Sequence, residues 1–126
     1  MSIGTDTNAS IMVPATRNSV YAMKPTLKLV SQQGICPISK DFDSAGPIAR
    51  CAYDIAVMMD VIVNPQMRKG ASSYTSHVTG SFEGIRIGVL DPKDWHLDTT
   101  MCRPNKSFDD QVVRFSVLLT RSLRLA

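Results

Sequence analysis

The sequence predicts an α/β fold in which a few short strands alternate with helices. Three observations favour this class. The hydrophobic pattern switches between a period of about 2 residues, typical of strands, and about 3.6, typical of helices. Hydrophobic residues make up 44% of the chain and charged residues 20%, which is typical of a globular domain rather than a disordered or fibrous protein. A chain of 126 residues has room for one domain with a modest core.

The first elements are short and rich in turn formers. Residues 2–9 are small and polar and predict a loop with no helical face. Pro14 suits the first position of a short helix over 15–19, because the N–H that proline lacks has no partner there in any case.

A strand and a long connection follow. Residues 20–23 predict a short buried strand, which ends at Lys24-Pro25 because proline restricts the residue before it. Residues 26–47 mix β-prone pieces with glycine and proline, and they predict an extended segment rich in loops.

The clearest helix is predicted over residues 50–62. Five apolar side chains recur on one face at helical spacing: Ala52, Ile55, Ala56, Met59 and Ile62. Asn64-Pro65 is a stop signal. Residues 66–80 are polar and rich in serine and threonine, which is typical of an exposed loop.

The C-terminal third predicts one strand, over 84–90, and one helix, over 107–123, which Ser107 can cap. The helix has a mostly apolar stripe: Phe108, Val112, Phe115, Leu118, Leu119 and Ser122. So few elements offer this stripe little partner surface, and the sequence therefore predicts self-association through exposed apolar surface. The elements together predict a single incomplete domain over 1–126, cut from the middle of a larger fold.

Composition argues against several kinds of partner. Fourteen Lys and Arg against eleven Asp and Glu give a net charge of +3, scattered along the chain, which does not predict a nucleic-acid-binding surface. No apolar run approaches the ~18 residues of a membrane span, and no signal peptide opens the chain. The three cysteines, Cys36, Cys51 and Cys102, lack the spacing of a disulfide framework or a zinc site. Reduced thiols, a cytoplasmic location, and no metal or cofactor are therefore expected.

The candidate site is a turn of small residues that ends in a serine. Hydrolysis of an amide by serine needs a hydroxyl beside a base and backbone N–H donors directed at the developing oxyanion. The segment Gly4-Thr5-Asp6-Thr7-Asn8-Ala9-Ser10-Ile11 has this form. By itself the segment fits an ordinary surface turn equally well.

The segments that follow give the turn its meaning. Five motifs stand in order: Gly4-Thr5-Asp6-Thr7-x-x-Ser10-Ile11, Pro14-Ala15, Lys24-Pro25-Thr26, Gly34-Ile35-x-Pro37-Ile38-Ser39 and Asp43-Ser44-x-Gly46-Pro47-Ile48-x-Arg50. Together they resemble the amidase signature family, and the resemblance continues through the helix over 50–62 to about residue 90. The form Tyr21-Ala22-Met23-Lys24-Pro25-Thr26 resembles the fungal branch of that family.

The resemblance implies a partial amidase-signature fold, a segment of mixed sheet with flanking helices, with its motifs in 2–90 and a helical tail over 107–124. It also implies a serine hydrolase that cleaves a small-molecule carboxylic amide through an acyl-serine. Ser10 aligns with the nucleophile. The N–H groups of Thr7, Asn8, Ala9 and Ser10 align with the oxyanion hole.

The family's triad also contains a bridging serine and a lysine base, both of which precede the nucleophile. Met1 stands only nine residues before Ser10, and Lys24 and Lys28 follow it without matching the base. Two alternatives stay open: a segment of an active hydrolase, or a truncated remnant without activity. Ala9 stands where the family usually has glycine, and alanine disfavours a positive φ. One oxyanion donor is therefore expected to turn away from its target.

The other polar residues of the motifs have structural expectations. Asp43 and Ser44 are expected to fix a loop under the active site rather than to react. Arg50 is expected to pair with a backbone group or a carboxylate near the start of the helix. His77 is expected to be a surface histidine.

Overall fold

The computed structural model describes residues 1–68, 70, 72–82, 84–88 and 105–124. The chain divides into two compact units, Met1–Thr79 and Gly80–Ala126, and each unit is described by itself.

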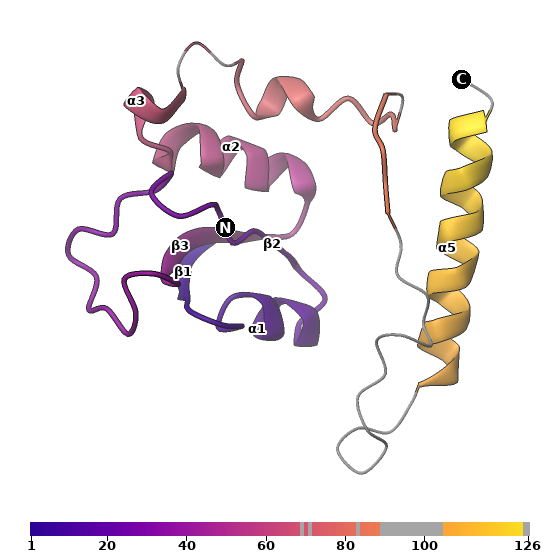
Figure 1. Cartoon of the computed structure of the whole chain (residues 1–126), viewed down its shortest axis with the longest axis horizontal. Coiled ribbons are helices and arrows are strands. Elements are labelled where there is room, and N and C mark those ends of the chain that lie inside the picture. The colour runs from indigo at the N-terminus through magenta and orange to yellow at the C-terminus, as the bar shows by residue number, and fades with distance from the viewer. Residues whose placement is uncertain (69, 71, 83, 89–104, 125–126) are drawn as a thin grey trace. The chain divides into compact units, whose positions relative to one another are not determined.

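A three-stranded antiparallel sheet forms the centre of Met1–Thr79 (Figure 1). Its strands are β1 (Ser2–Asp6), β2 (Tyr21–Ala22) and β3 (Ser44–Ala49), in the order β1-β3-β2. Both outer strands pair with β3, with Gly4 opposite Gly46 and Ala22 opposite Ile48. The predicted α/β class is confirmed.

The strand predictions have mixed outcomes. β2 lies inside the strand predicted over 20–23. β1 lies where the sequence predicted a loop, and β3 begins inside the segment predicted to be rich in loops, so both predictions are wrong there. The cause is long-range pairing: the small residues of β1 form a strand because β3 supplies hydrogen-bond partners for their backbone.

Helix α1 (Met12–Arg17) begins earlier than the helix predicted over 15–19, and Pro14 is its third residue rather than its first. No side chain at the N-cap, Ile11, accepts a hydrogen bond. The carboxylate of Asp6 does so instead, because its Oδ2 accepts from Ile11 N at 2.7 Å and from Met12 N at 3.4 Å. The helix start is thus set from the end of β1.

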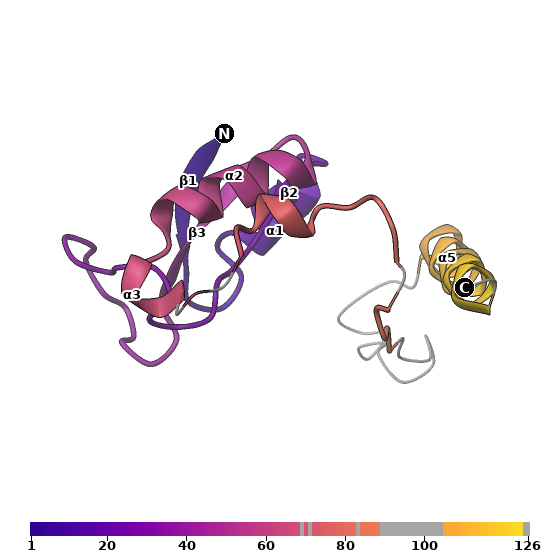
Figure 2. The same ribbon diagram turned by 90° about the horizontal axis from the view of Figure 1, so that it is seen from above.

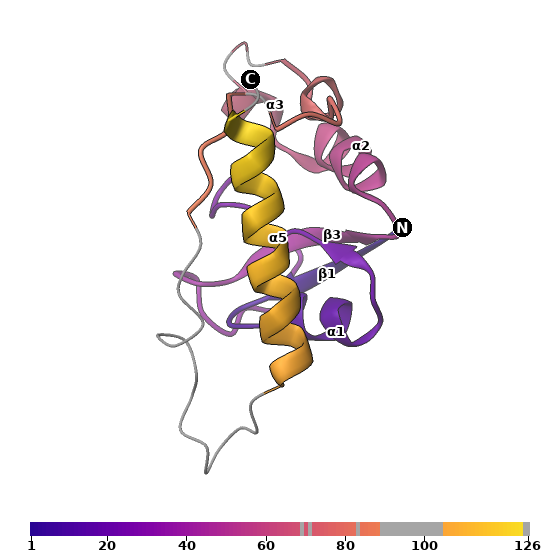
Figure 3. The same ribbon diagram turned by 90° about the vertical axis from the view of Figure 1, so that its right-hand side faces the viewer.

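Helix α2 (Ala52–Ile62) confirms the helix predicted over 50–62, with a start two residues later. Cys51 is its N-cap, and the sulfur accepts from Asp54 N at 3.4 Å. The buried face of α2 packs against β3 in one core cluster, made of Val30, Ala45, Ala49, Ile55, Met59 and Val63. Helices α1 and α2 lie on opposite sides of the sheet in Figures 1 and 3. In the view from above, α2 crosses over the strands (Figure 2).

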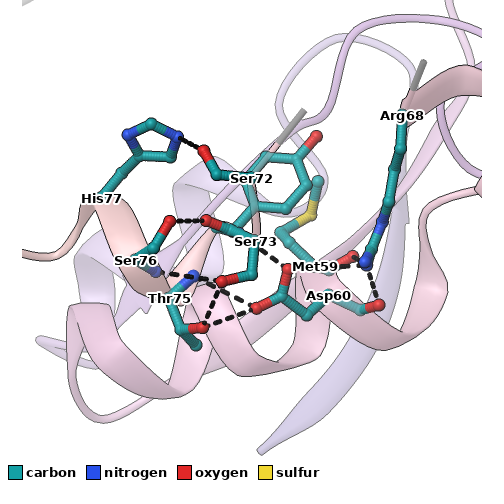
Figure 4. Close-up of polar contacts among 9 residues, drawn as sticks. Met59, Asp60, Arg68, Ser72, Ser73, Thr75, Ser76 and His77 are labelled. Atoms are coloured by element: carbon teal, nitrogen blue, oxygen red, sulfur yellow. Dashed lines mark hydrogen bonds and ion pairs between the residues drawn. The ribbon is translucent and has the colours of Figure 1, made fainter. Parts of the chain in front are cut away.

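The segment after α2 contains two short helical turns, α3 (Pro65–Arg68) and the 3-10 helix η1 (Thr75–His77), where the sequence predicted only an exposed loop. The side chain of Asp60 explains why this segment is ordered against α2. Its carboxylate accepts from Tyr74 N at 2.7 Å, from Thr75 N at 3.1 Å and from Thr75 Oγ1 at 2.9 Å (Figure 4). Arg68 pairs with the same carboxylate and donates to the Asp60 carbonyl.

Acidification is expected to release Tyr74 and Thr75 from Asp60. Burial raises the pKa of Asp60, but the N–H groups of Tyr74 and Thr75, the Thr75 hydroxyl and the charge of Arg68 together hold that pKa below its ordinary value of 3.8. The free energy that this carboxylate contributes is therefore fully present above pH 3.8, and it is lost as the pH falls through the lowered pKa.

The amide resonances of Tyr74 and Thr75, followed by NMR from neutral pH into acid, measure this transition. Asp60→Asn is the control, because its side chain does not titrate and these two resonances should lose the acid transition. A transition at or above the ordinary pKa of 3.8 in the native chain would contradict the expectation.

In Gly80–Ala126, helix α5 (Lys106–Arg124) confirms the helix predicted over 107–123. Its cap is Asn105 rather than Ser107, because Asn105 Oδ1 accepts from Phe108 N at 3.2 Å. Phe108 and Phe115 are about half exposed on it, at 53% and 56%. Self-association through this surface stays a prediction.

The strand predicted over 84–90 does not form in residues 84–88, and residues 89–90 lie outside the described part of the chain. The apolar alternation is present there, but no described residue pairs with it as a neighbouring strand. Alternation without a pairing partner does not make a strand.

Candidate active site

Ser10 lies in the tight connection between β1 and α1. The connection, residues 7–11, begins directly after the last residue of β1 and ends one residue before α1. Ser10 is exposed, as is Asn8, and its hydroxyl forms no hydrogen bond with any other described residue. We call residues 7–10 the serine turn. Its hydroxyl is therefore accessible to a substrate.

Asp6 fixes the start of the serine turn from below. The residue is only 1% exposed. Its Oδ2 holds the backbone at Ile11 and Met12, while its Oδ1 accepts from Lys24 Nζ at 3.0 Å. Burial raises the pKa of Asp6, but the Ile11 N–H and the Lys24 ammonium outweigh burial and hold the pKa below its ordinary value. Asp6 is therefore a carboxylate at neutral pH.

Lys24 makes a second contact with the same turn. Its Nζ donates to the carbonyl oxygen of Thr7 at 2.7 Å, in addition to the ion pair with Asp6. An ammonium has three donors and no acceptor, so two of the three are used here. The motif order assigned Lys24 only to Lys-Pro-Thr and indicated no partner for its side chain.

Asp43 fixes the serine turn from the other side. The Thr7 hydroxyl donates to Asp43 Oδ1 at 2.6 Å, and Oδ2 accepts from Ile38 N at 2.7 Å and from Ser39 N at 2.9 Å. The Thr7 hydrogen bond is the largest cause of a lowered pKa at Asp43; burial opposes it, and the two backbone N–H groups add to it. Asp43 thus ties loop 38–43 to the turn, as the sequence predicted for a loop-fixing role.

Ser44 and Gly46 join the neighbouring segment to the sheet. Ser44 is buried, and its Oγ donates to the carbonyl of Pro25 at 2.8 Å. The backbone at Met23 lies so close to Gly46 that a Cβ there would overlap with the Met23 carbonyl oxygen. The segment that carries Lys24 therefore passes directly over β3.

The four N–H groups of the serine turn donate to no other described residue, although the carbonyl of Ala9 accepts from Val13 N at 2.9 Å. A backbone N–H without an internal partner is available to a ligand. Among the described residues other than glycine, only Ser19 and Lys28 have positive φ. The expectation that Ala9 turns a donor away is therefore unsupported, because Ala9 occupies the turn without the φ that only glycine accepts freely.

The remaining candidate residues do not join the site. Arg50 is exposed and forms no ion pair with another described residue, so the predicted pairing does not form among them. Cys36 and Cys51 are free thiols, and Cys102 lies outside the described residues. His77 is exposed, as predicted, and its Nε2 lies 2.8 Å from Ser72 Oγ (Figure 4). No group of His, Cys, Asp or Glu in the described part of the chain is arranged to hold a metal ion.

Three cavities lie within Met1–Thr79, and Ser10 lines none of these three. The most apolar one, of about 380 Å³, lies between β2, α2 and the segment around Tyr74. The other two, of about 260 Å³ and 430 Å³, share Gln32, Lys40 and Asp43 as lining residues. Asp43 is thus the link between these two cavities and the serine turn.

Comparison with known proteins places the chain in a family. Residues 1–114 match the family model described as Amidase. A subunit of glutamyl-tRNA(Gln) amidotransferase from Ruminiclostridium cellulolyticum is 36% identical over 101 residues, which are 75% of this chain and 20% of that protein. A probable amidase from Arabidopsis thaliana is also 36% identical over 101 residues, 71% of this chain and 20% of its own length.

A solved structure supports the same assignment. The crystal structure of an amidase family protein from Bacillus anthracis strain Ames matches with a TM-score of 0.52 and 33% identity, over 58% of this chain and 16% of that one. No helix in the described part of the chain is both long and apolar enough to cross a membrane. The relatives are bacterial and plant proteins, so the predicted fungal branch is not supported. The chain spans about a fifth of the length of these curated relatives, and over that span it belongs to the amidase family.

Proposed function

We propose that this chain supplies the nucleophile, Ser10, and the oxyanion-binding turn of a serine hydrolase that cleaves a small-molecule carboxylic amide. The observation that carries the proposal is the serine turn itself. Its hydroxyl is exposed, its N–H groups donate to no described residue, and Asp6, Lys24 and Asp43 hold its frame. The names of the relatives, a probable amidase and part of an amidotransferase, also point to an amide as the group acted on.

The reaction would proceed in two halves. Ser10 Oγ attacks the amide carbonyl carbon while its proton passes to a base, and the N–H groups of the serine turn donate to the resulting oxyanion. Collapse of the tetrahedral intermediate breaks the C–N bond, and the leaving amine or ammonia takes up a proton. Water then attacks the acyl-serine, releases the acid and returns the proton to Ser10.

The base is the part that these 126 residues do not supply in the proposal. A lysine can remove the serine proton only when it is neutral, which requires a desolvated site without an opposite charge. Lys24 is paired with the buried carboxylate of Asp6 and does not fit that role. In the family that the chain resembles, the base and the bridging serine precede the nucleophile. A remnant without activity is the alternative function.

Labelling with a fluorophosphonate probe separates these two functions. The 126-residue chain alone is expected to label no more than Ser10→Ala and to show no amide turnover above it. Fusion to the residues that precede the equivalent serine in the Ruminiclostridium relative is expected to produce labelling at Ser10. The matched control is Ser107→Ala in the fused protein, which removes another exposed serine and should label normally.

Each result has a distinct meaning. Labelling of the fused protein that survives Ser10→Ala would show that another residue is the nucleophile. A fused, folded protein without labelling would favour the inactive remnant. Robust Ser10-dependent hydrolysis by the 126 residues alone would show that a base lies within them.

A further inference from the structure

We infer that Lys24 is a positioning residue that sets the direction of the oxyanion-binding N–H of Asn8, and that it does not act as a base. The inference rests on the proposed function of the serine turn. It assigns a role to a residue that neither the motif order nor the cysteine, histidine and cavity patterns explain.

The path of the chain over β3 brings Lys24 to the turn. Because the strand order is β1-β3-β2, the residues after β2 are separated from β1 by the whole width of β3. The absence of a side chain at Gly46 lets the Met23 backbone cross β3 closely, and Met23 N donates to the Pro47 carbonyl at 3.1 Å. Lys24 Nζ therefore reaches the end of β1, where Asp6 lies 3.0 Å away.

Peptide geometry converts this contact into a direction. In a planar trans peptide, the carbonyl oxygen of one residue and the N–H of the next point to opposite sides. Lys24 binds the Thr7 carbonyl at 2.7 Å, so the Asn8 N–H is held pointing away from Lys24. By the same geometry, the Ala9 carbonyl is held by Val13 N at 2.9 Å, and the Ser10 N–H points away from α1.

Asn8 and Ser10 are thus the two donors whose directions are fixed by a contact on the preceding carbonyl. The Asn8 direction depends on one side chain, that of Lys24, whereas the Ser10 direction depends on the backbone of α1. Thr7 is held again through its hydroxyl, which donates to Asp43 at 2.6 Å, so the Thr7 side chain cannot rotate freely while its carbonyl is bound. Preorganised donors of this kind stabilise an oxyanion without reorganising during the reaction.

The first test measures the turn in the 126-residue chain by NMR. Lys24→Met removes both contacts with little change in side-chain length, and it is expected to shift the Asn8 amide resonance strongly and the Ser10 amide resonance weakly. Lys24→Arg keeps the charge for Asp6, but a planar guanidinium places its donors differently, so a smaller Asn8 shift is expected with the fold retained. Lys40→Met is the matched control, because Lys40 is exposed and bonds to no other described residue.

The second test measures function in the fused protein described above. Loss of one oxyanion donor lowers catalysis by about a hundredfold in a serine hydrolase. Lys24→Met is therefore expected to slow Ser10 labelling by about that factor, Lys24→Arg by less, and Lys40→Met not at all. Equal unfolding midpoints for native and Lys24→Arg proteins show that the slower labelling of the arginine variant is an effect on the turn rather than on folding.

The outcomes separate this inference from the proposed function. An Asn8 resonance that does not move in either Lys24 variant overturns the positioning role, as does labelling at the native rate in both. If the Asn8 resonance moves but the native fused protein never labels at Ser10, the proposed function fails while the geometric role of Lys24 stands. If Lys24→Met does not fold, the arginine variant decides the question by itself.

Discussion

Asp6→Ala is expected to lower the free energy of unfolding of the chain by about 3 kcal/mol, because it removes one half of a buried, hydrogen-bonded ion pair. The side chain of Asp6 is fully buried and serves three donors, the N–H groups of Ile11 and Met12 and the Lys24 ammonium. Alanine offers none of them an acceptor. A loss of this size is a large fraction of the stability of a small domain, so a substantially unfolded chain at room temperature is within the expected result.

Urea unfolding followed by circular dichroism at neutral pH measures the loss. Asp41→Ala is the matched control, since Asp41 is exposed and bonds to no other described residue, and its change should stay within about 0.5 kcal/mol. Asp6→Asn keeps one carbonyl oxygen for the Ile11 N–H but not the charge for Lys24, so it should fall between the two. Equal midpoints for Asp6→Ala and Asp41→Ala would show that the ion pair and the cap at α1 do not stabilise the chain.

The elements that the sequence predicts well are those whose signals are local. The helix α2 follows from apolar side chains at helical spacing and from the stop at Asn64-Pro65, and the structure moves only its start. The helix α5 follows in the same way from its own stripe. Every part of these signals lies within a few turns of helix, where side-chain spacing alone determines the buried face.

The elements that the sequence misses depend on distant partners. β1 and β3 consist largely of small residues, and they become strands because they pair with each other across about forty residues of chain. Residues 84–88 show the reverse case, an alternating pattern without a paired strand among the described residues. The start of α1 depends on a carboxylate that lies outside the helix, on β1.

The candidate site shows the same division. Ser10 and the serine turn could be proposed from the order of the motifs, but no spacing in the sequence indicates that Lys24 reaches Asp6 across 18 positions or that Thr7 reaches Asp43 across 36. Both contacts arise because β3 lies between the segments that carry them. The small residue that permits this arrangement, Gly46, was recognisable only as part of a motif.

Gly46→Ala is expected to destabilise the chain by about 3 kcal/mol, at the upper end of the cost of overpacking. The new Cβ would overlap with the Met23 carbonyl oxygen and lie 2.7 Å from Pro25 Cδ, and neither atom belongs to a flexible side chain that can move aside. The segment that carries Lys24 would have to rise from β3, which also draws the ammonium away from Asp6 and Thr7. Stability and the geometry of the serine turn should therefore change together.

Two other glycines calibrate this expectation. Gly4→Ala places a Cβ 3.2 Å from Ile11 Cγ1, a side-chain atom that can shift, so a smaller loss of unfolding free energy is expected. Gly88→Ala meets nothing within 4 Å and should leave stability unchanged. Urea unfolding of the three variants, with the Asn8 amide resonance recorded for each, should give the order Gly46, then Gly4, then Gly88 for the loss, with the Asn8 shift largest for Gly46→Ala. A Gly46→Ala protein as stable as Gly88→Ala, with its Asn8 resonance in place, would show that the crossing over β3 is loose and that it does not hold Lys24 against the turn.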